Sequence, residues 1–245
     1  MSSDLFSRIR VVLSCTFHPG NIGSAARAIK TMGLSRLVLV SPVRFPDREA
    51  NALASNAVDV LENAVVCSSL DEALAGTALQ IAFTARSRAL SHASLPVREA
   101  VVDAVSVAAS QEVALVFGNE TVGLSNEDVI RCNRVAFIPT DAESSSLNLA
   151  AAVQIAAYEL RLAALGSPGA QESASELAPH EEMERFFAHL EKSIYASSFL
   201  QPDNPRRMME RLRRQFGRSG LEKEEVNIWR GMLSAWDEKS KKGNS

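Results

Sequence analysis

Apolar runs of strand length alternate with helical patterns from residue 9 to residue 165. Most of the runs are continuous Val, Ile and Leu, which is typical of parallel strands that helices cover on both faces. The pattern predicts strands over Arg10–Cys15, Arg36–Ser41, Ala64–Cys67, Leu79–Phe83, Val113–Phe117 and Val135–Ile138. It predicts helices over 21–32, 48–60, 70–75, 96–109, 125–131 and 147–165. This alternation indicates an α/β fold with a parallel sheet.

The remainder of the chain has a different composition. Residues 166–180 are rich in Gly, Ser, Pro and Glu, which predicts a flexible linker. Three short amphipathic helices are expected beyond it, over Glu181–Phe199, Pro205–Phe216 and Leu221–Trp236, with fraying from Asp237 onward. We therefore expect an α/β domain over 1–165, a linker over 166–180 and a helical extension over 181–245.

The predicted helix over 147–165 is poor in charge, with Gln154, Tyr158 and Arg161 forming its polar stripe. Such a helix is buried on more than one side. One side must face the sheet. The other either lies inside a monomer or meets a second subunit, and the pattern favours a homodimer.

Composition narrows the class of protein. No apolar run approaches the roughly 18 residues of a membrane span, and the polar N-terminus does not look like a signal peptide. Three scattered cysteines predict reduced core thiols in a cytoplasmic protein, and no Cys/His spacing suggests a metal. The net charge of −3 does not exclude nucleic acid, because six arginines lie together: Arg206, Arg207, Arg211, Arg213, Arg214 and Arg218.

The first strand ends in a candidate anion site, His18–Ala28. A helix starts near Asn21, and the N–H groups of a first helical turn suit a phosphate. Gly20 and Gly23 would allow close approach, and Arg27, one turn beyond Gly23, could reach the same anion. A capped helix with a surface arginine is the alternative. His18 could touch a ligand or be merely solvated, whereas His92, His180 and His189 are expected at the surface.

Two later strands end in polar loops at the same sheet edge, where α/β proteins bind ligands. In the first, Gly118 and Gly123 permit a sharp turn, while Asn119 and Glu120 offer hydrogen-bonding groups. In the second, Ser144–Ser146 precede an apolar helix, and one of them is expected to be its N-cap.

The loop that closes the fourth strand, Thr84–Arg88, reaches this edge as well. Arg86 and Arg88 either grip an RNA phosphate or are ordinary loop arginines. We place Arg86 with Asn21, Asn119 and Glu120 as expected support for the substrate.

These segments resemble the SPOUT class of RNA methyltransferases, of the TrmH/TrmJ type. Within it, the chain is similar to the tRNA (cytidine/uridine-2′-O-)-methyltransferase J family, which methylates ribose at nucleotide 32 of the anticodon loop. The likeness is carried by the segments GNIGSAARA, FTARSR, LVFGNETVGLS and SSLNLAAAVQIAAYE. The linker and tail also look like that family's C-terminal extension. The chain departs from that family in one place, because members of the family carry arginine where Asn119 stands, whereas other ribose methyltransferases of the class carry asparagine.

The resemblance implies a trefoil knot, S-adenosyl-L-methionine bound within it, a homodimer and tRNA as substrate. Arg27 matches the arginine that is essential in relatives that methylate the 2′-oxygen. The implied cofactor contacts are Phe83, Thr84, Ala85, Gly118, Ile138, Ser145, Ser146 and Leu147. The expected RNA contacts of the tail are Arg206, Arg207, Arg211, Arg213 and Arg214.

The implied chemistry fits the residue inventory. A sulfonium methyl group is already activated, so neither a metal nor a nucleophilic side chain is required. The remaining need is alignment of the 2′-oxygen and removal of its proton. Two alternatives stay open, ribose methylation of ribosomal RNA and a non-catalytic RNA-binding role. The intact Arg27, Asn21 and serine loop favour an enzyme.

Overall fold

A computed structural model describes residues 2–85, 94–166, 176–197, 199 and 207–243. Its sheet has seven strands, all parallel, in the order β3-β2-β1-β6-β4-β7-β5. The strands are β1 Ile9–Ser14, β2 Arg36–Val40, β3 Val65–Cys67, β4 Thr77–Phe83, β5 Ser94–Pro96, β6 Glu112–Phe117 and β7 Arg134–Phe137. The predicted parallel α/β fold is confirmed.

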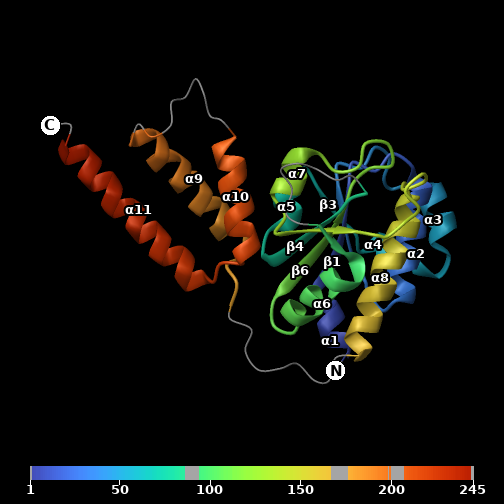
Figure 1. Cartoon of the computed structure of the whole chain (residues 1–245). Helices are drawn as coiled ribbons and strands as arrows, with labels where there is room; N and C mark the ends of the chain where they lie inside the picture. The colour runs from blue at the N-terminus through green and yellow to red at the C-terminus, as the bar shows by residue number, and fades with distance from the viewer. Residues whose placement is uncertain (1, 86–93, 167–175, 198, 200–206, 244–245) are drawn as a thin grey trace.

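Helices cover both faces of this sheet (Figure 1). They are α1 Ser2–Ser7, α2 Pro19–Thr31, α3 Arg48–Ala54, η1 Ser55–Ala57, α4 Val58–Glu62, α5 Leu70–Leu74, α6 Val97–Ala108, α7 Asn126–Ile130 and α8 Leu149–Gly166. The larger core lies between the sheet and α2, α3, α4, α6 and α8. A smaller core packs α5 and α7 on the opposite face. Both faces of the central strands are therefore buried, as their apolar runs predict.

The observed elements differ from the predicted ones in a few places. The short helix α1 and strand β5 were not predicted, because neither is long enough to show a period. The α-helix expected over 48–60 is broken at Ser55, whose φ of +54° does not fit the interior of a right-handed α-helix. Pro96 ends β5 and precedes the first turn of α6, instead of lying within that turn.

The helical tail has its own small core. Its helices are α9 His180–Ala196, α10 Met208–Ser219 and α11 Lys223–Gly243, so α11 continues through residues that were expected to fray. Phe216 packs edge-on against Phe186 and Trp229, with ring centroids 5.0 and 5.3 Å apart. These aromatic contacts hold the three helices together.

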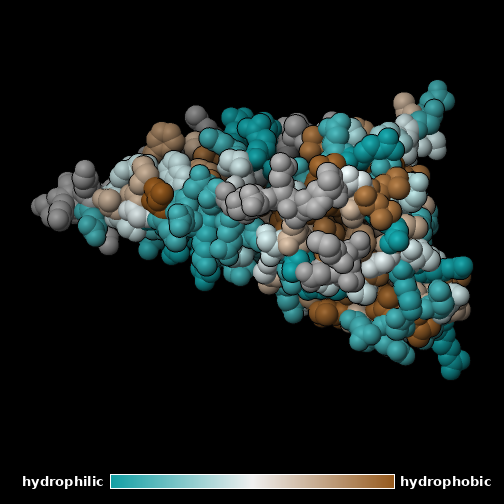
Figure 2. All heavy atoms as spheres, turned by 90° about the horizontal axis from the view of Figure 1, so that it is seen from below, coloured by the Kyte–Doolittle hydropathy of each residue, from teal (hydrophilic) through white to brown (hydrophobic). Residues whose placement is uncertain are grey.

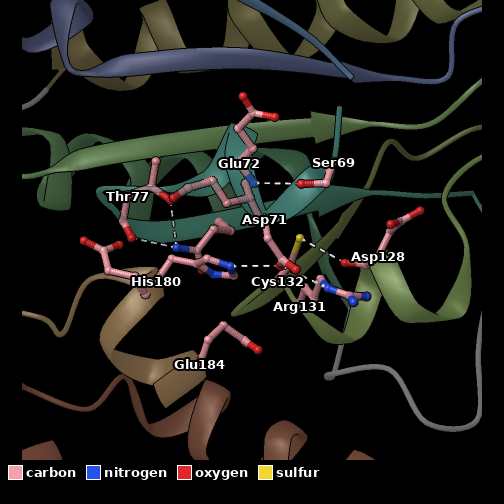
Figure 3. A network of polar contacts seen from close by, with 12 residues as sticks. Ser69, Asp71, Glu72, Thr77, Asp128, Arg131, Cys132, His180 and Glu184 are labelled. Carbon is pink, nitrogen blue, oxygen red and sulfur yellow. Dashed lines mark hydrogen bonds and ion pairs between the residues drawn. The ribbon is translucent and has the colours of Figure 1, made fainter. Parts of the chain in front are cut away.

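The tail packs against the α5 and α7 side of the sheet (Figure 1). His180 is buried, and its Nε2 lies 3.2 Å from the Asp71 carboxylate, which also accepts a 3.1 Å bond from Arg131 (Figure 3). The expectation that His180 lies at the surface is therefore wrong. Because Asp71 belongs to α5 and His180 begins α9, this contact joins the two parts of the chain.

Further bonds fix the start of the tail. The side-chain amide of Gln111 donates to the Leu177 carbonyl at 2.8 Å and accepts from the Leu177 N–H at 3.0 Å. Ala178 is buried. The predicted flexible linker over 166–180 is thus too wide, since Gly166 belongs to α8 and residues 176–180 are bonded or packed. Its centre, 167–175, lies outside the described residues.

The cysteines are only partly as predicted. All three are free, and Cys67 and Cys132 are buried in the smaller core. Burial raises the pKa of the Cys132 thiol, which keeps it protonated. Cys15 is exposed, in contrast to the expected core position, because a left-handed turn with φ +53° follows β1 there.

Candidate functional site

A pocket opens where β4, β6 and β7 end at the carboxyl edge of the sheet. It brings together segments that are far apart in the sequence, and every implied cofactor residue lines it. The lining consists of Phe83, Thr84, Ala85, Phe117, Gly118, Asn119, Glu120, Thr121, Val122, Gly123, Ile138, Ser145, Ser146, Leu147, Leu149 and Ala152. The rings of Phe83 and Phe117, which both belong to this lining, stack with their centroids 4.5 Å apart. Parallel neighbours ending together explain this convergence.

The loop after β6 is shaped by close backbone contact. A Cβ atom at Gly118 would lie 2.1 Å from the carbonyl carbon of Gly123 and 2.1 Å from the N atom of Leu124. The Asn119 side chain accepts bonds from the N–H groups of Thr121 at 3.0 Å and Val122 at 2.8 Å. Asn119 therefore uses its side-chain oxygen to build the loop, and it also lines the pocket.

Glu120 ties this loop to the one after β1. Its carboxylate accepts bonds from the N–H groups of Phe17 and His18 at 2.9 and 3.1 Å, and from the Asn21 side chain at 2.7 Å. Partial burial pushes the pKa of the Glu120 carboxyl upward, but the hydrogen bonds from Asn21 and from nearby backbone N–H groups outweigh it. The net pKa lies below the ordinary value. The N–H groups of Phe17 and His18 are thus occupied by the protein's own carboxylate.

Asn148 joins the third loop to the same group. Its Nδ2 donates to Oδ1 of Asn21 at 2.9 Å, and its own Oδ1 accepts from the N–H groups of Ala150 and Ala151. Asn148, and not a serine, therefore caps α8. The sequence offered one signal of this role, an amide residue placed directly before the apolar helix.

The two glycines of the first loop serve packing between helices. A Cβ atom at Gly23 would lie 2.0 Å from the Ala50 carbonyl oxygen, and one at Gly20 would lie 2.8 Å from Glu49 and Leu53 side-chain atoms. All three neighbours belong to α3. The interpretation that these glycines admit an anion is therefore wrong. They let α2 approach α3 closely.

Arg27 stands apart from the pocket of its own chain. It is an exposed residue of α2, six positions after Asn21, or about 9 Å further along the helix axis. It does not line the pocket. Gly23 packs on α3 while Arg27 is exposed, so the close approach at Gly23 does not support the predicted sharing of one anion.

The expected RNA contacts of the tail divide into two kinds. Arg207 and Arg211 are exposed. Arg213 instead pairs with Glu184 through two bonds and lies 4.4 Å from the centre of the Phe187 ring. Arg214 is half-buried and interacts with another group of the chain. Arg86, Arg88, His92 and Arg206 lie outside the described residues.

The Glu120 contacts make a testable prediction. Replacement by Gln keeps one acceptor but places an amide N–H₂ among three donors, so we expect Glu120→Gln to destabilise the fold by about 2 kcal/mol. Urea unfolding at neutral pH measures the loss. If the variant were as stable as the parent, Glu120 would not hold the two loops together.

The same carboxylate should contribute a pH dependence. Because the folded state lowers the pKa of Glu120, its contribution is complete above the ordinary glutamate pKa and disappears as the pH falls through the lowered value. The parent should therefore lose stability with acid over that range, and Glu120→Gln should show a weaker acid dependence in the same unfolding measurement.

Two family models together match most of the chain. The SpoU rRNA methylase family matches residues 8–158, and the C-terminal domain of the tRNA methyltransferase TrmJ matches residues 181–245. The tRNA (cytidine/uridine/adenosine-2′-O-)-methyltransferase TrmJ of Pseudomonas aeruginosa is 47% identical over 94% of each chain. The tRNA (cytidine/uridine-2′-O-)-methyltransferase TrmJ of Escherichia coli K12 is 45% identical over 97% of this chain and 98% of its own length.

Solved structures agree with these matches. TrmJ from Zymomonas mobilis ZM4 superposes with a TM-score of 0.80 at 30% identity, covering 92% of this chain and 97% of its own. A protein described by its role in 2-OH methylation of C/U34 on tRNA gives a TM-score of 0.54 at 26% identity, over 66% of this chain and 99% of its own.

An AdoMet-bound rRNA methyltransferase from Sinorhizobium meliloti also superposes, with a TM-score of 0.50 at 25% identity, over 63% of this chain and 56% of its own. Family models and full-length relatives thus point the same way as the pocket at the carboxyl edge. The chain belongs to the SpoU methylase family and, within it, to the TrmJ methyltransferases that carry this C-terminal domain.

Proposed function

We propose that the chain methylates the ribose 2′-hydroxyl of cytidine or uridine at nucleotide 32 of the tRNA anticodon loop, with S-adenosyl-L-methionine as methyl donor. The main observation behind this proposal is the pocket that the three strand-end loops form together. The names of the full-length relatives support the tRNA substrate and the 2′-O position. The AdoMet-bound relative supports the donor.

The pocket has the mixed chemistry that such a donor requires. Phe83, Ile138 and Leu149 offer apolar surface for an adenine ring, while Thr84 and Ser145–Ser146 offer hydroxyl and backbone groups for its ribose and amino-acid ends. Gly118 also lines the pocket, and its missing side chain lets the Gly123–Leu124 backbone close the loop beside it. The residues therefore fit the donor, which supplies an activated methyl group when it is bound.

The chain's own residues would orient the acceptor. The proton of the 2′-hydroxyl must leave as the oxygen attacks, and a neighbouring phosphate or water can take it. Arg27 is unsuited to be the base, because an arginine pKa stays above about 12. We assign it the orientation of the adjacent phosphate and the stabilisation of the developing alkoxide. Glu120, Asn21 and Asn148 hold the loops in place.

We also infer that the α/β domain contains a trefoil knot and that two chains form a homodimer. One face of α8 exposes Ala151, Leu162 and Leu165 at helical spacing, with the amphipathic Tyr158 between them. Figure 2 shows exposed hydrophobic residues over the wide end of the molecule, where the α/β domain lies. In the part of the chain that the structure describes, only α8 is long and apolar enough to cross a membrane, a test that core helices also pass. Sedimentation should give twice the chain mass of 26.5 kDa.

A dimer would also explain how Arg27 reaches an active site. Because Arg27 does not line the pocket of its own chain, we assign it to the pocket of the partner subunit. The contacts between α2 and α8 place both helices on the same side of the sheet, so a partner seated on α8 would lie near α2. The site would then be complete only in the dimer.

The tail arginines should separate binding from stability. We expect Arg211→Ala to weaken tRNA binding and reduce the salt slope of log Kd by about 1, because one exposed phosphate contact is lost. Arg213→Ala should instead lower the melting temperature of the tail, since its Glu184 pair and Phe187 contact disappear. Salt-dependent filter binding and thermal unfolding of both variants check this. Equal effects on both readouts would refute the division.

The target nucleotide can be tested with matched tRNA transcripts. One carries 2′-deoxycytidine at nucleotide 32, and the other carries a 2′-deoxy nucleotide at 34. We expect methyl incorporation into the second transcript and none into the first. The opposite result would move the target to nucleotide 34, as named for the shorter structural neighbour. Incorporation into ribosomal RNA alone would overturn the assignment.

A further inference from the structure

Phe17 presents an aromatic ring to solvent beside the pocket. Its side chain is 47% exposed, while Thr16 before it and Pro19 after it are buried. An isolated exposed apolar residue needs no explanation. Phe17 is distinguished by its position. It lies in the loop after β1, and Glu120, which lines the pocket, is hydrogen-bonded to this loop.

The backbone under this ring is held from two sides. The Phe17 N–H donates to Oε2 of Glu120 at 2.9 Å, and Glu120 lines the pocket. The carbonyl oxygen of Thr16 accepts a 3.1 Å bond from the Val43 N–H. These contacts fix the ring's attachment point, so little conformational entropy remains for a ligand to remove at this backbone.

Other exposed apolar side chains lie on the adjoining loops. Val43, bonded through its backbone to Thr16, is 57% exposed. Val122, which lines the pocket beside Glu120, is 54% exposed. Phe17, Val43 and Val122 are thus exposed apolar residues on three loops that hydrogen bonds connect, those after β1, β2 and β6.

We propose that Phe17 stacks on a nucleobase next to the nucleotide that is methylated. This inference rests on the proposed function, which brings a single-stranded RNA loop to this pocket. Proteins recognise such loops by splaying bases onto aromatic rings. To present one ribose to the pocket, the loop must unstack the adjacent bases, and the fixed ring offers one of them a new partner. Stacking tolerates any base, since each has a π face.

The test compares Phe17→Leu, which keeps an apolar side chain without the π face, with Phe17→Tyr, which keeps the face. We expect Phe17→Leu to weaken tRNA binding about 5- to 100-fold, the range measured for loss of one stacked base, and Phe17→Tyr to bind like the parent. Titration calorimetry with S-adenosylmethionine should give the parent affinity for both variants, because Phe17 does not line the pocket.

A second readout reports stacking directly. tRNA with 2-aminopurine on either side of the target nucleotide should lose fluorescence with the parent and Phe17→Tyr, and regain it with Phe17→Leu. Equal tRNA affinity and equal quenching for both variants would overturn the proposal. Loss of S-adenosylmethionine binding in Phe17→Leu would also overturn it, as it would reveal a structural role. A parent protein that methylates no tRNA would instead remove the proposed function itself.

Discussion

Arg27→Ala should lower the methylation rate by about 100- to 1,000-fold, the loss seen when one group that stabilises a developing oxyanion is removed. The side chain is exposed on α2, so its removal should leave the fold unchanged. S-adenosylmethionine binding should also persist, because Arg27 does not line the pocket. Single-turnover methylation and titration calorimetry separate the two effects.

The control is Arg48→Ala. Arg48 is another exposed arginine, at the start of the neighbouring helix α3. The Arg48→Ala variant should keep near-parent activity. This result would show that the loss in Arg27→Ala comes from the specific role of Arg27 and not from the removal of a positive charge. Full activity in Arg27→Ala would refute its assignment to the developing alkoxide. Mixing Arg27→Ala with a variant whose own pocket is disabled should restore part of the activity if the arginine acts across the dimer.

Gly118→Ala should weaken cofactor binding strongly for a steric reason. Its new methyl group would lie 2.1 Å from backbone atoms of Gly123 and Leu124, which cannot move aside as a side-chain end can. The loop must therefore change shape, at a cost of about 3 kcal/mol. If that cost falls on the bound state, affinity drops about 100-fold. Calorimetry with S-adenosylmethionine measures it.

Gly123→Ala provides the matched comparison in the same loop. A Cβ atom there meets nothing within 4 Å, and only the φ of +70° opposes a side chain. We expect a loss of about 1–2 kcal/mol, clearly smaller than at Gly118. If the two variants lost equal affinity, crowding at Gly118 would not be the cause.

The fold could be predicted from the sequence because its strands are buried on both faces and its loops are rich in Gly and Ser. The apolar runs of β1, β2, β4, β6 and β7 specify parallel strands within a residue or two. Short elements such as β5 carry no such signal. Its three residues become a strand only through pairing with β7.

For the site, the sequence predicted which residues line the pocket but not which partners they bond to. Motif likeness identified pocket residues such as Thr84 and Leu147, and the structure brings them together. What each polar side chain bonds to could not be read from the sequence, because partners such as Glu120 and Asn21 are 99 residues apart. For the same reason, Gly23 was interpreted as a ligand contact although it packs against Ala50. Likewise, Arg213 was assigned to RNA although it pairs with Glu184.

The link from Glu120 through Asn21 to Asn148 has a consequence for biosynthesis. Asn21 leaves the ribosome early, yet its partners follow 99 and 127 residues later. Contacts between such distant positions form slowly, because closing the long intervening loop costs conformational entropy before the contact can form. The nascent protein can therefore assemble β1 and β2 while its pocket does not yet exist. Competence to methylate would appear only once Asn148 has emerged.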